Sequence, residues 1–173
     1  NFGSGSVLEI EQGRGNRDLF YAVVRSGSTC TLHRSEDGGQ VWTALTGLPT
    51  NWGSMEIALN PADDDEIWAI KADDDEVRRS LDGGSSWSNL GVGLLGEALR
   101  DVVCLGDAGA GVVSTTGGFH RAAGAGSWTS FGTGLPARWA PFECLPFYRD
   151  GLLRVGDKGK GIWQADFPFE PAP

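Results

Sequence analysis

Two acidic runs are the residues most suggestive of metal chemistry. They are Asp63-Asp64-Asp65-Glu66 and Asp73-Asp74-Asp75-Glu76. Calcium takes about six to eight oxygen ligands, and flexible acidic loops can supply them. Neither run has the spaced ligands or the central glycine of an EF-hand, and both fall where hairpin turns are expected. We therefore interpret them as solvated turns and predict neither a metal nor another cofactor.

The cysteines and histidines also lack a metal-binding pattern. Cys30, Cys104 and Cys144 show no Cys-x-x-Cys spacing, and His33 and His120 are far apart in the sequence. An odd number of cysteines leaves at least one unpaired. We expect Cys104 and Cys144 to be buried free thiols; a disulfide between them would indicate an extracellular protein.

One octapeptide occurs twice, as 35–42 and 80–87, and both copies read Ser-x-Asp-x-Gly-x-x-Trp. The aspartate can accept backbone N–H groups inside a tight turn, and glycine adopts positive φ there without a steric penalty. The tryptophan then returns a large apolar ring to the sheet. We call these segments the Ser-Asp turns and assign them a structural role, which also commits their carboxylates. The residues concerned are Ser35, Asp37, Gly39, Trp42, Ser80, Asp82, Gly84 and Trp87.

The turns belong to a longer repeat. Trp42, Trp87 and Trp128 follow one another at intervals of 45 and 41 residues, and Ala123 replaces the aspartate in the third copy. Each unit contains four short runs of strand character separated by turn residues. The predicted units are about 5–49, 50–96, 97–138 and 139–167, the last with only three strands, and a proline-rich exit linker follows at 168–173.

Residues 5–167 resemble the Asp-box (BNR) repeat β-propellers. The resemblance is carried by Ile57-Ala58-Leu59-Asn60-Pro61 and by Arg79-Ser80-x-Asp82-Gly83-Gly84-x-x-Trp87. The segment 159–167 looks like the closing strand of secreted bacterial propellers of this type. The resemblance implies an all-β propeller, or an arc of one, with four-stranded antiparallel blades. Its wider group includes sialidases, xyloglucan-active hydrolases, sortilin-like receptors and photosystem assembly factors, so it does not decide the activity.

The blade count leaves the closure of the ring open. Three blades and three strands of a fourth could be part of a propeller of about six to eight blades, an arc completed by another chain, or a four-bladed ring. We favour the first, because an open arc would expose apolar blade faces. The chain begins at Asn1 without methionine, which we interpret as a processed or excised segment.

Glycoside hydrolysis would require two carboxyl groups on either side of one bond. Glu56 and Glu143 fall in the innermost predicted strands, but the sequence pairs neither with a second carboxylate. Tyr21 and Tyr148 are better explained as strand or turn residues than as nucleophiles. We therefore predict no catalytic residue.

Three aromatic residues are the candidates for ligand binding. Trp52 and Trp139 precede the first strands of two blades, and Phe2 is the equivalent in the first blade. Loops joining the last strand of one blade to the first strand of the next open on one face near the axis, where rings could stack on a sugar or a peptide. The alternative is that these rings fill gaps between blades.

The overall composition limits the partners. The 173 residues carry a formal charge of −9, which argues against nucleic acid and anionic membranes as partners. The sequence contains no run of about 18 apolar residues, the length that a membrane-spanning helix needs. We expect a non-catalytic binding or scaffold module, secreted or on a cell surface, that engages glycan or protein. The alternatives are a segment of a xyloglucanase-like hydrolase whose catalytic carboxylates lie partly outside this chain, and a purely structural role through self-association or contact with further blades.

Overall fold

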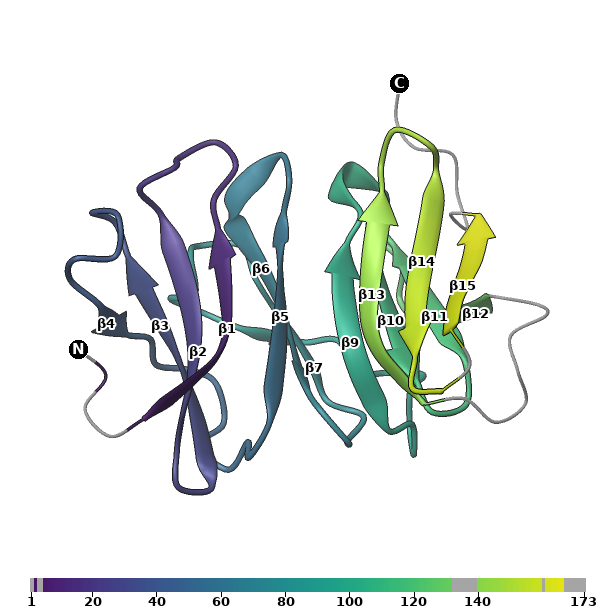
Figure 1. The fold of residues 1–173 in the computed structure, drawn as a ribbon, viewed down its shortest axis with the longest axis horizontal. Helices are drawn as coiled ribbons and strands as arrows, with labels where there is room; N and C mark the ends of the chain where they lie inside the picture. The colour runs from purple at the N-terminus through teal and green to yellow at the C-terminus, as the bar shows by residue number, and fades with distance from the viewer. Residues whose placement is uncertain (1, 3–4, 132–139, 160, 167–173) are drawn as a thin grey trace.

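The computed structural model describes residues 2, 5–131, 140–159 and 161–166, and these form four antiparallel sheets (Figure 1). Three sheets have four strands and the last has three, each in chain order. The first two sheets comprise β1 (Ser6–Gln12), β2 (Phe20–Ser26), β3 (Thr29–Ser35), β4 (Thr43–Ala44), β5 (Met55–Asn60), β6 (Asp63–Lys71), β7 (Val77–Ser80) and β8 (Ser88–Asn89). The others comprise β9 (Leu99–Cys104), β10 (Gly109–Ser114), β11 (Gly118–Ala122), β12 (Thr129–Phe131), β13 (Pro141–Phe147), β14 (Leu152–Asp157) and β15 (Gly161–Asp166), with a single 3₁₀ turn, η1 (Gly106–Ala108), before β10.

The sheets are arranged as consecutive blades (Figure 1). The first strands, β1, β5, β9 and β13, contact one another in that order and form the inner surface of the arc. No ladder joins one described blade to the next, so side chains and a few isolated backbone hydrogen bonds hold the blades together. Three apolar clusters fill the three junctions, each drawing buried residues from both blades.

The predicted architecture of three full blades and a three-stranded fourth is confirmed. The gap between the third and fourth blades, 132–139, and the predicted linker, 168–173, lie outside the described residues. Among the described residues, no helix is long and apolar enough to cross a membrane.

The two Ser-Asp turns have the hydrogen bonds that their residue types predict. In the first, Ser35 Oγ donates to Asp37 Oδ1 at 2.8 Å, and the Trp42 indole donates to the Gly39 carbonyl at 2.9 Å. The second turn repeats both bonds at 2.8 and 3.0 Å. Both motif glycines have positive φ, 86° for Gly39 and 90° for Gly84, which explains why this position is glycine.

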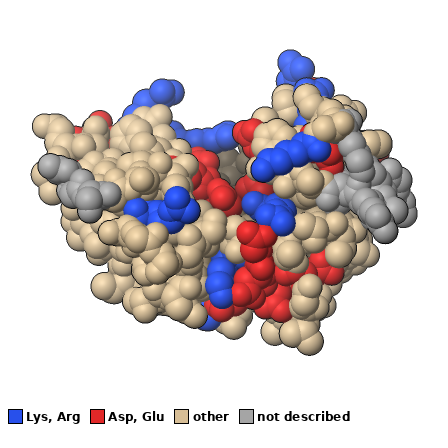
Figure 2. All heavy atoms as spheres, turned by 60° about the horizontal axis from the view of Figure 1, so that its bottom comes forward, with Lys and Arg blue, Asp and Glu red and all other residues tan. Residues whose placement is uncertain are grey.

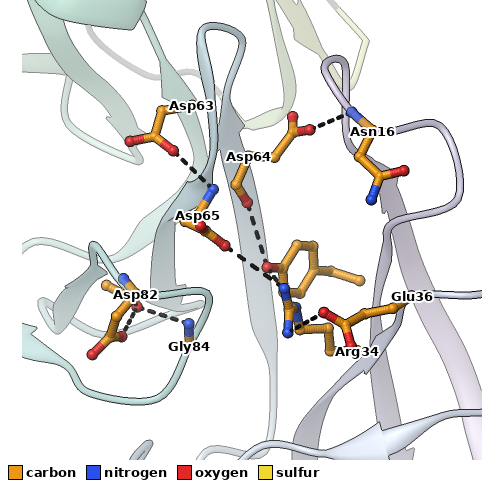
Figure 3. A network of polar contacts seen from close by, with 10 residues as sticks. Asn16, Arg34, Glu36, Asp63, Asp64, Asp65, Asp82 and Gly84 are labelled. Carbon is orange, nitrogen blue, oxygen red and sulfur yellow. Dashed lines mark hydrogen bonds and ion pairs between the residues drawn. The ribbon is translucent and has the colours of Figure 1, made fainter.

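The first acidic run joins two blades (Figure 3). The carboxylate of Asp64, at the start of β6, accepts the backbone N–H groups of Arg14 at 2.7 Å, Gly15 at 3.2 Å and Asn16 at 2.6 Å. These groups belong to the turn between β1 and β2 in the neighbouring blade. The interpretation of this run as a solvated turn is therefore wrong for Asp64, whose carboxylate caps three amides of another sheet.

The second acidic run lies at the next junction. Leu99, the first residue of β9, donates its N–H to the Asp74 carbonyl at 3.0 Å and accepts the Asp73 N–H at 2.8 Å. Asp75 accepts the Gly96 N–H at 2.8 Å, and Asp73 forms an ion pair with Arg100 at 2.5 Å. Both acidic runs thus connect adjacent blades.

We predict that Asp64→Ala lowers the free energy of unfolding by about 1–3 kcal/mol, because three amides lose their acceptor. Asp63→Ala is the matched control, since Asp63 accepts only the nearby Asp65 N–H at 3.1 Å. Urea denaturation of both variants measures the difference. Equal losses in the two variants would show that the contact between the blades contributes nothing measurable.

Candidate functional site

The inner surface of the arc encloses a groove of about 440 Å³, lined by residues of all four first strands. Figure 2 shows a hollow near the centre of the molecule with acidic side chains on its walls. Five carboxyl groups line the groove: Glu9 and Glu11 of β1, Glu56 of β5, Asp101 of β9 and Glu143 of β13. Arg14 is the single basic residue in its described lining.

Four of these carboxyl groups are supplied by one repeated position. Glu9 pairs with Val23, Glu56 with Ile70 and Asp101 with Val113. In each blade the second strand also pairs with the first residue of the turn motif, through Phe20, Ile67 or Ala110. The residue that pairs with the acid lies three positions after that residue in all three blades, so the acids are structurally equivalent. Glu143 directly follows a bulge in β13, as Glu9 and Asp101 do in their strands. The groove therefore receives one acid from each blade.

Two of the four acids connect neighbouring first strands. Glu9 Oε2 accepts the N–H of Ile57 in β5 at 2.9 Å, and Asp101 Oδ2 accepts the N–H of Cys144 in β13. Burial, with a smaller contribution from the neighbouring Glu56, raises the pKa of Glu9 to about 9. Burial also raises the pKa of Asp101 to about 7, against the opposing effect of its two backbone hydrogen bonds. Glu9 is consequently protonated at neutral pH.

The other two acids are available to a ligand. Within the described part of the chain, neither Glu56 nor Glu143 makes a hydrogen bond or an ion pair. Burial raises the pKa of Glu56, whereas the Glu143 side chain is exposed. Both lie near the beginning of their strands, at the end of the groove closer to the loops between blades.

Arg14 spans the far end of the groove. Its guanidinium carbon lies 5.1 Å from the centre of the Tyr148 ring, so the first blade contacts the fourth across the groove. The Tyr148 hydroxyl donates to the Cys104 carbonyl at 2.7 Å, and burial raises its pKa to about 12. Tyr148 lies in the turn after β13, as predicted, where its ring packs and its hydroxyl donates a hydrogen bond.

The sequence offered no second carboxylate for Glu56 or Glu143, because sequence reasoning missed Glu9 and Asp101, which line the same groove. The repeat carried only a weak signal, because the acid lies 26, 24 and 20 residues before the first position of the three turns, so counting back along the sequence does not align it. The bulges in β1 and β9 shift the strand register and obscure this equivalence in the sequence.

Neither Trp52 nor Phe2 is among the described residues that line the groove. Trp52 is fully buried between the first two blades, and its indole N–H points to Glu76 Oε2 at 3.3 Å, so its ring has no face open to a ligand. Phe2 packs against Trp42 and His33, with ring centres 5.0 and 5.2 Å apart. Trp139 lies outside the described residues. Trp52 therefore lies where the alternative places it, in the gap between two blades, whereas Phe2 packs against two rings of the first blade.

The three cysteines are buried free thiols, as expected for Cys104 and Cys144. Burial raises the pKa of Cys104 to about 12, so this thiol is not reactive at neutral pH. In the part of the chain that the structure describes, no three His, Cys, Asp or Glu side chains converge in a geometry that could hold a metal ion.

Comparison with solved structures identifies the architecture. YCF48 bound to D1 peptide superposes with a TM-score of 0.71 at 17% identity, over 96% of this chain and 53% of that one. The GH74 xyloglucanase from Xanthomonas campestris superposes with a TM-score of 0.71 at 17% identity, over 91% of this chain and 29% of that one. A streptogramin B lyase superposes with a TM-score of 0.66 at 15% identity, over 96% of this chain and 56% of that one. The chain has a β-propeller fold. It spans about half or less of the length of these proteins.

These propellers differ in function, so the shared fold leaves the activity undecided. The comparison with family models finds no match. The search of curated proteins finds none either.

We predict that stability falls as pH rises from 7 to 9. A carboxyl group whose pKa is higher in the folded state than its unfolded value of 4.5 stabilises the fold fully below that value, and this contribution is lost as pH rises through about 9. Glu9→Gln keeps an oxygen that can accept the Ile57 N–H but cannot ionise. At pH 8 it should therefore exceed the wild type in free energy of unfolding by more than about 1 kcal/mol.

Denaturant unfolding of both proteins at pH 5, 7, 8 and 9 measures this difference. It should shrink towards pH 5, where Glu9 of the unfolded chain also begins to bind a proton. A difference that does not change with pH would rule out ionisation of Glu9 as its cause.

Proposed function

We propose that this chain is a non-catalytic binding module of propeller architecture that holds a basic segment of another protein in its acidic groove. One observation carries the proposal: Glu56 and Glu143 line the groove without a hydrogen-bond or ion-pair partner among the described residues. A lysine or arginine side chain would give each carboxylate a charged partner, and at the half-buried Glu56 such a pair is stronger than at the surface.

The other two acids support a binding role over catalysis. Glu9 and Asp101 are committed to backbone amides of the neighbouring first strands, and their burial follows from that position. The YCF48 relative in the comparison was solved with a peptide, which is consistent with peptide recognition by this fold. The ligand face of the proposal is the end of the groove near the loops between blades. The secreted or cell-surface location stays a prediction from the sequence.

A glycoside hydrolase is the second candidate, favoured by the same groups. A protonated Glu9 beside ionisable acids in one groove has the composition of a general acid and its partner base. GH74 enzymes are among the proteins with a similar fold. We rank this candidate below binding because Glu9 and Asp101 already accept hydrogen bonds from backbone amides of the neighbouring strands.

We predict that a fluorescent hexalysine peptide binds the wild-type protein saturably at moderate ionic strength, whereas hexaglutamate does not. The double variant Glu56→Gln/Glu143→Gln should weaken hexalysine binding at least tenfold in fluorescence anisotropy titrations. Asp18→Asn/Asp166→Asn removes the same charge from two exposed carboxylates outside the groove and should change affinity less than twofold.

If both double variants lost the same affinity for hexalysine, the net charge of the protein would explain the loss, and the groove would be rejected as the binding site. A parallel incubation with xyloglucan oligosaccharides distinguishes the second candidate. The release of new reducing ends, lost in Glu9→Gln, would replace the binding proposal with the hydrolase. Saturable oligosaccharide binding without cleavage would reject the protein ligand in favour of a glycan.

A further inference from the structure

A second cleft, of about 290 Å³, lies at the junction of the second and third blades, away from the central groove. Its lining includes Glu66 of β6, Arg79 of β7, Arg121 at the end of β11 and the residues 122–125 of the degenerate third turn. Two guanidinium groups thus line a small cavity of a protein whose net charge is −9.

The first arginine of the cleft has a complete set of partners. Arg79 Nε donates to Glu66 Oε1 at 2.8 Å, and its guanidinium carbon lies 5.2 Å from the centre of the Trp68 ring. Glu66 also accepts the Trp68 indole N–H at 2.8 Å and the Asn60 amide at 2.7 Å. The Glu66 carboxylate is therefore committed to these three donors.

The second arginine has no such set. Arg121 Nη1 is buried and makes no hydrogen bond to any described residue. Burial, with a smaller contribution from nearby Arg79, lowers the pKa of Arg121. The Arg121 side chain is half-buried as a whole, and its buried Nη1 donor lacks a partner, so this position favours an added anion.

The repeat explains why the partner is missing. Arg121 takes the place of Ser35 and Ser80, whose hydroxyls donate to the aspartate of their own turns at 2.8 Å. In the third turn that aspartate is replaced by Ala123. The third turn therefore has a cation in place of the serine and no carboxylate in place of the aspartate.

The junction of the first and second blades shows the neutral form of the same arrangement. Arg34, the counterpart of Arg79, pairs with Glu36 at 2.9 Å and Asp65 at 3.7 Å (Figure 3). The positions equivalent to these two acids are Leu81 and Ala108 at the second junction. Asp107 lies at the edge of the second cleft, where it is exposed and forms no ion pair with a described residue.

We propose that this cleft binds a small oxyanion, a carboxylate or a phosphate group, which Arg121 holds with Arg79 beside it. Guanidinium groups bind both kinds of anion through paired N–H donors, and the cavity accommodates a group of this size. The site is separate from the acidic groove, so it stands or falls independently of the proposed function.

The test follows the arginine Nε–Hε signals by NMR while sodium phosphate or sodium acetate is added, with sodium chloride holding the ionic strength constant. We expect a saturable shift of the Arg121 signal with at least one anion, and the two titrations identify its class. Arg121→Gln should weaken binding at least tenfold, measured on the Arg79 signal. Arg34→Gln, at the junction where acids already neutralise the arginine, should leave the affinity within twofold.

A second variant tests the site by filling it from within. Ala123→Asp restores the carboxylate of the turn and gives Arg121 an intramolecular partner. It should abolish anion binding and raise the unfolding midpoint in urea. The proposal is overturned if the Arg121 signal does not saturate, if Arg121→Gln binds as the wild type does, or if Ala123→Asp binds the anion with unchanged affinity.

Discussion

The cohesion of this fold depends on carboxylates that accept backbone N–H groups from a neighbouring sheet. Hydrogen-bonded ladders end at the edges of each described blade, so each junction must satisfy its exposed amides in another way. Asp64 does this at the turn between β1 and β2, and Glu9 and Asp101 do it at the axis. Apolar clusters provide the bulk of the junctions, and the acids fix how one blade is aligned on the next.

The same constraint produces the electrostatics of the groove. A first strand can reach the amide of the next only through a side chain directed towards the axis, where the other blades place theirs. The acids therefore accumulate in one partly buried space, and burial raises the pKa values of Glu9 and Asp101. Glu56 and Glu143 occupy the same position but make no hydrogen bond to a described residue, so they are the candidates for ligand recognition.

Much of the fold could be predicted from the sequence because its signals are local. Turn residues, alternating strands and the spacing of Trp42, Trp87 and Trp128 define the blades without knowledge of long-range contacts. The site could not be predicted in the same way. Whether Trp52 is exposed depends on how two blades pack, and the contact of Asp64 with Asn16 spans 48 residues of sequence. The alignment of Glu9 with Asp101 also required the bulges that only the strand register shows.

Because the central acids occupy one repeated position, the number of carboxyl groups in the groove depends on how many blades of this type are present. Copying a blade of this type would add one more carboxyl group to the same confined space, without any selection for that charge. Each added copy would then have to lose its acid, bind a proton or find a cation, because like charges in a partly buried site repel strongly. Propellers that grow by duplicating such blades therefore contain, from the start, several carboxyl groups at the axis that can become a binding or catalytic site.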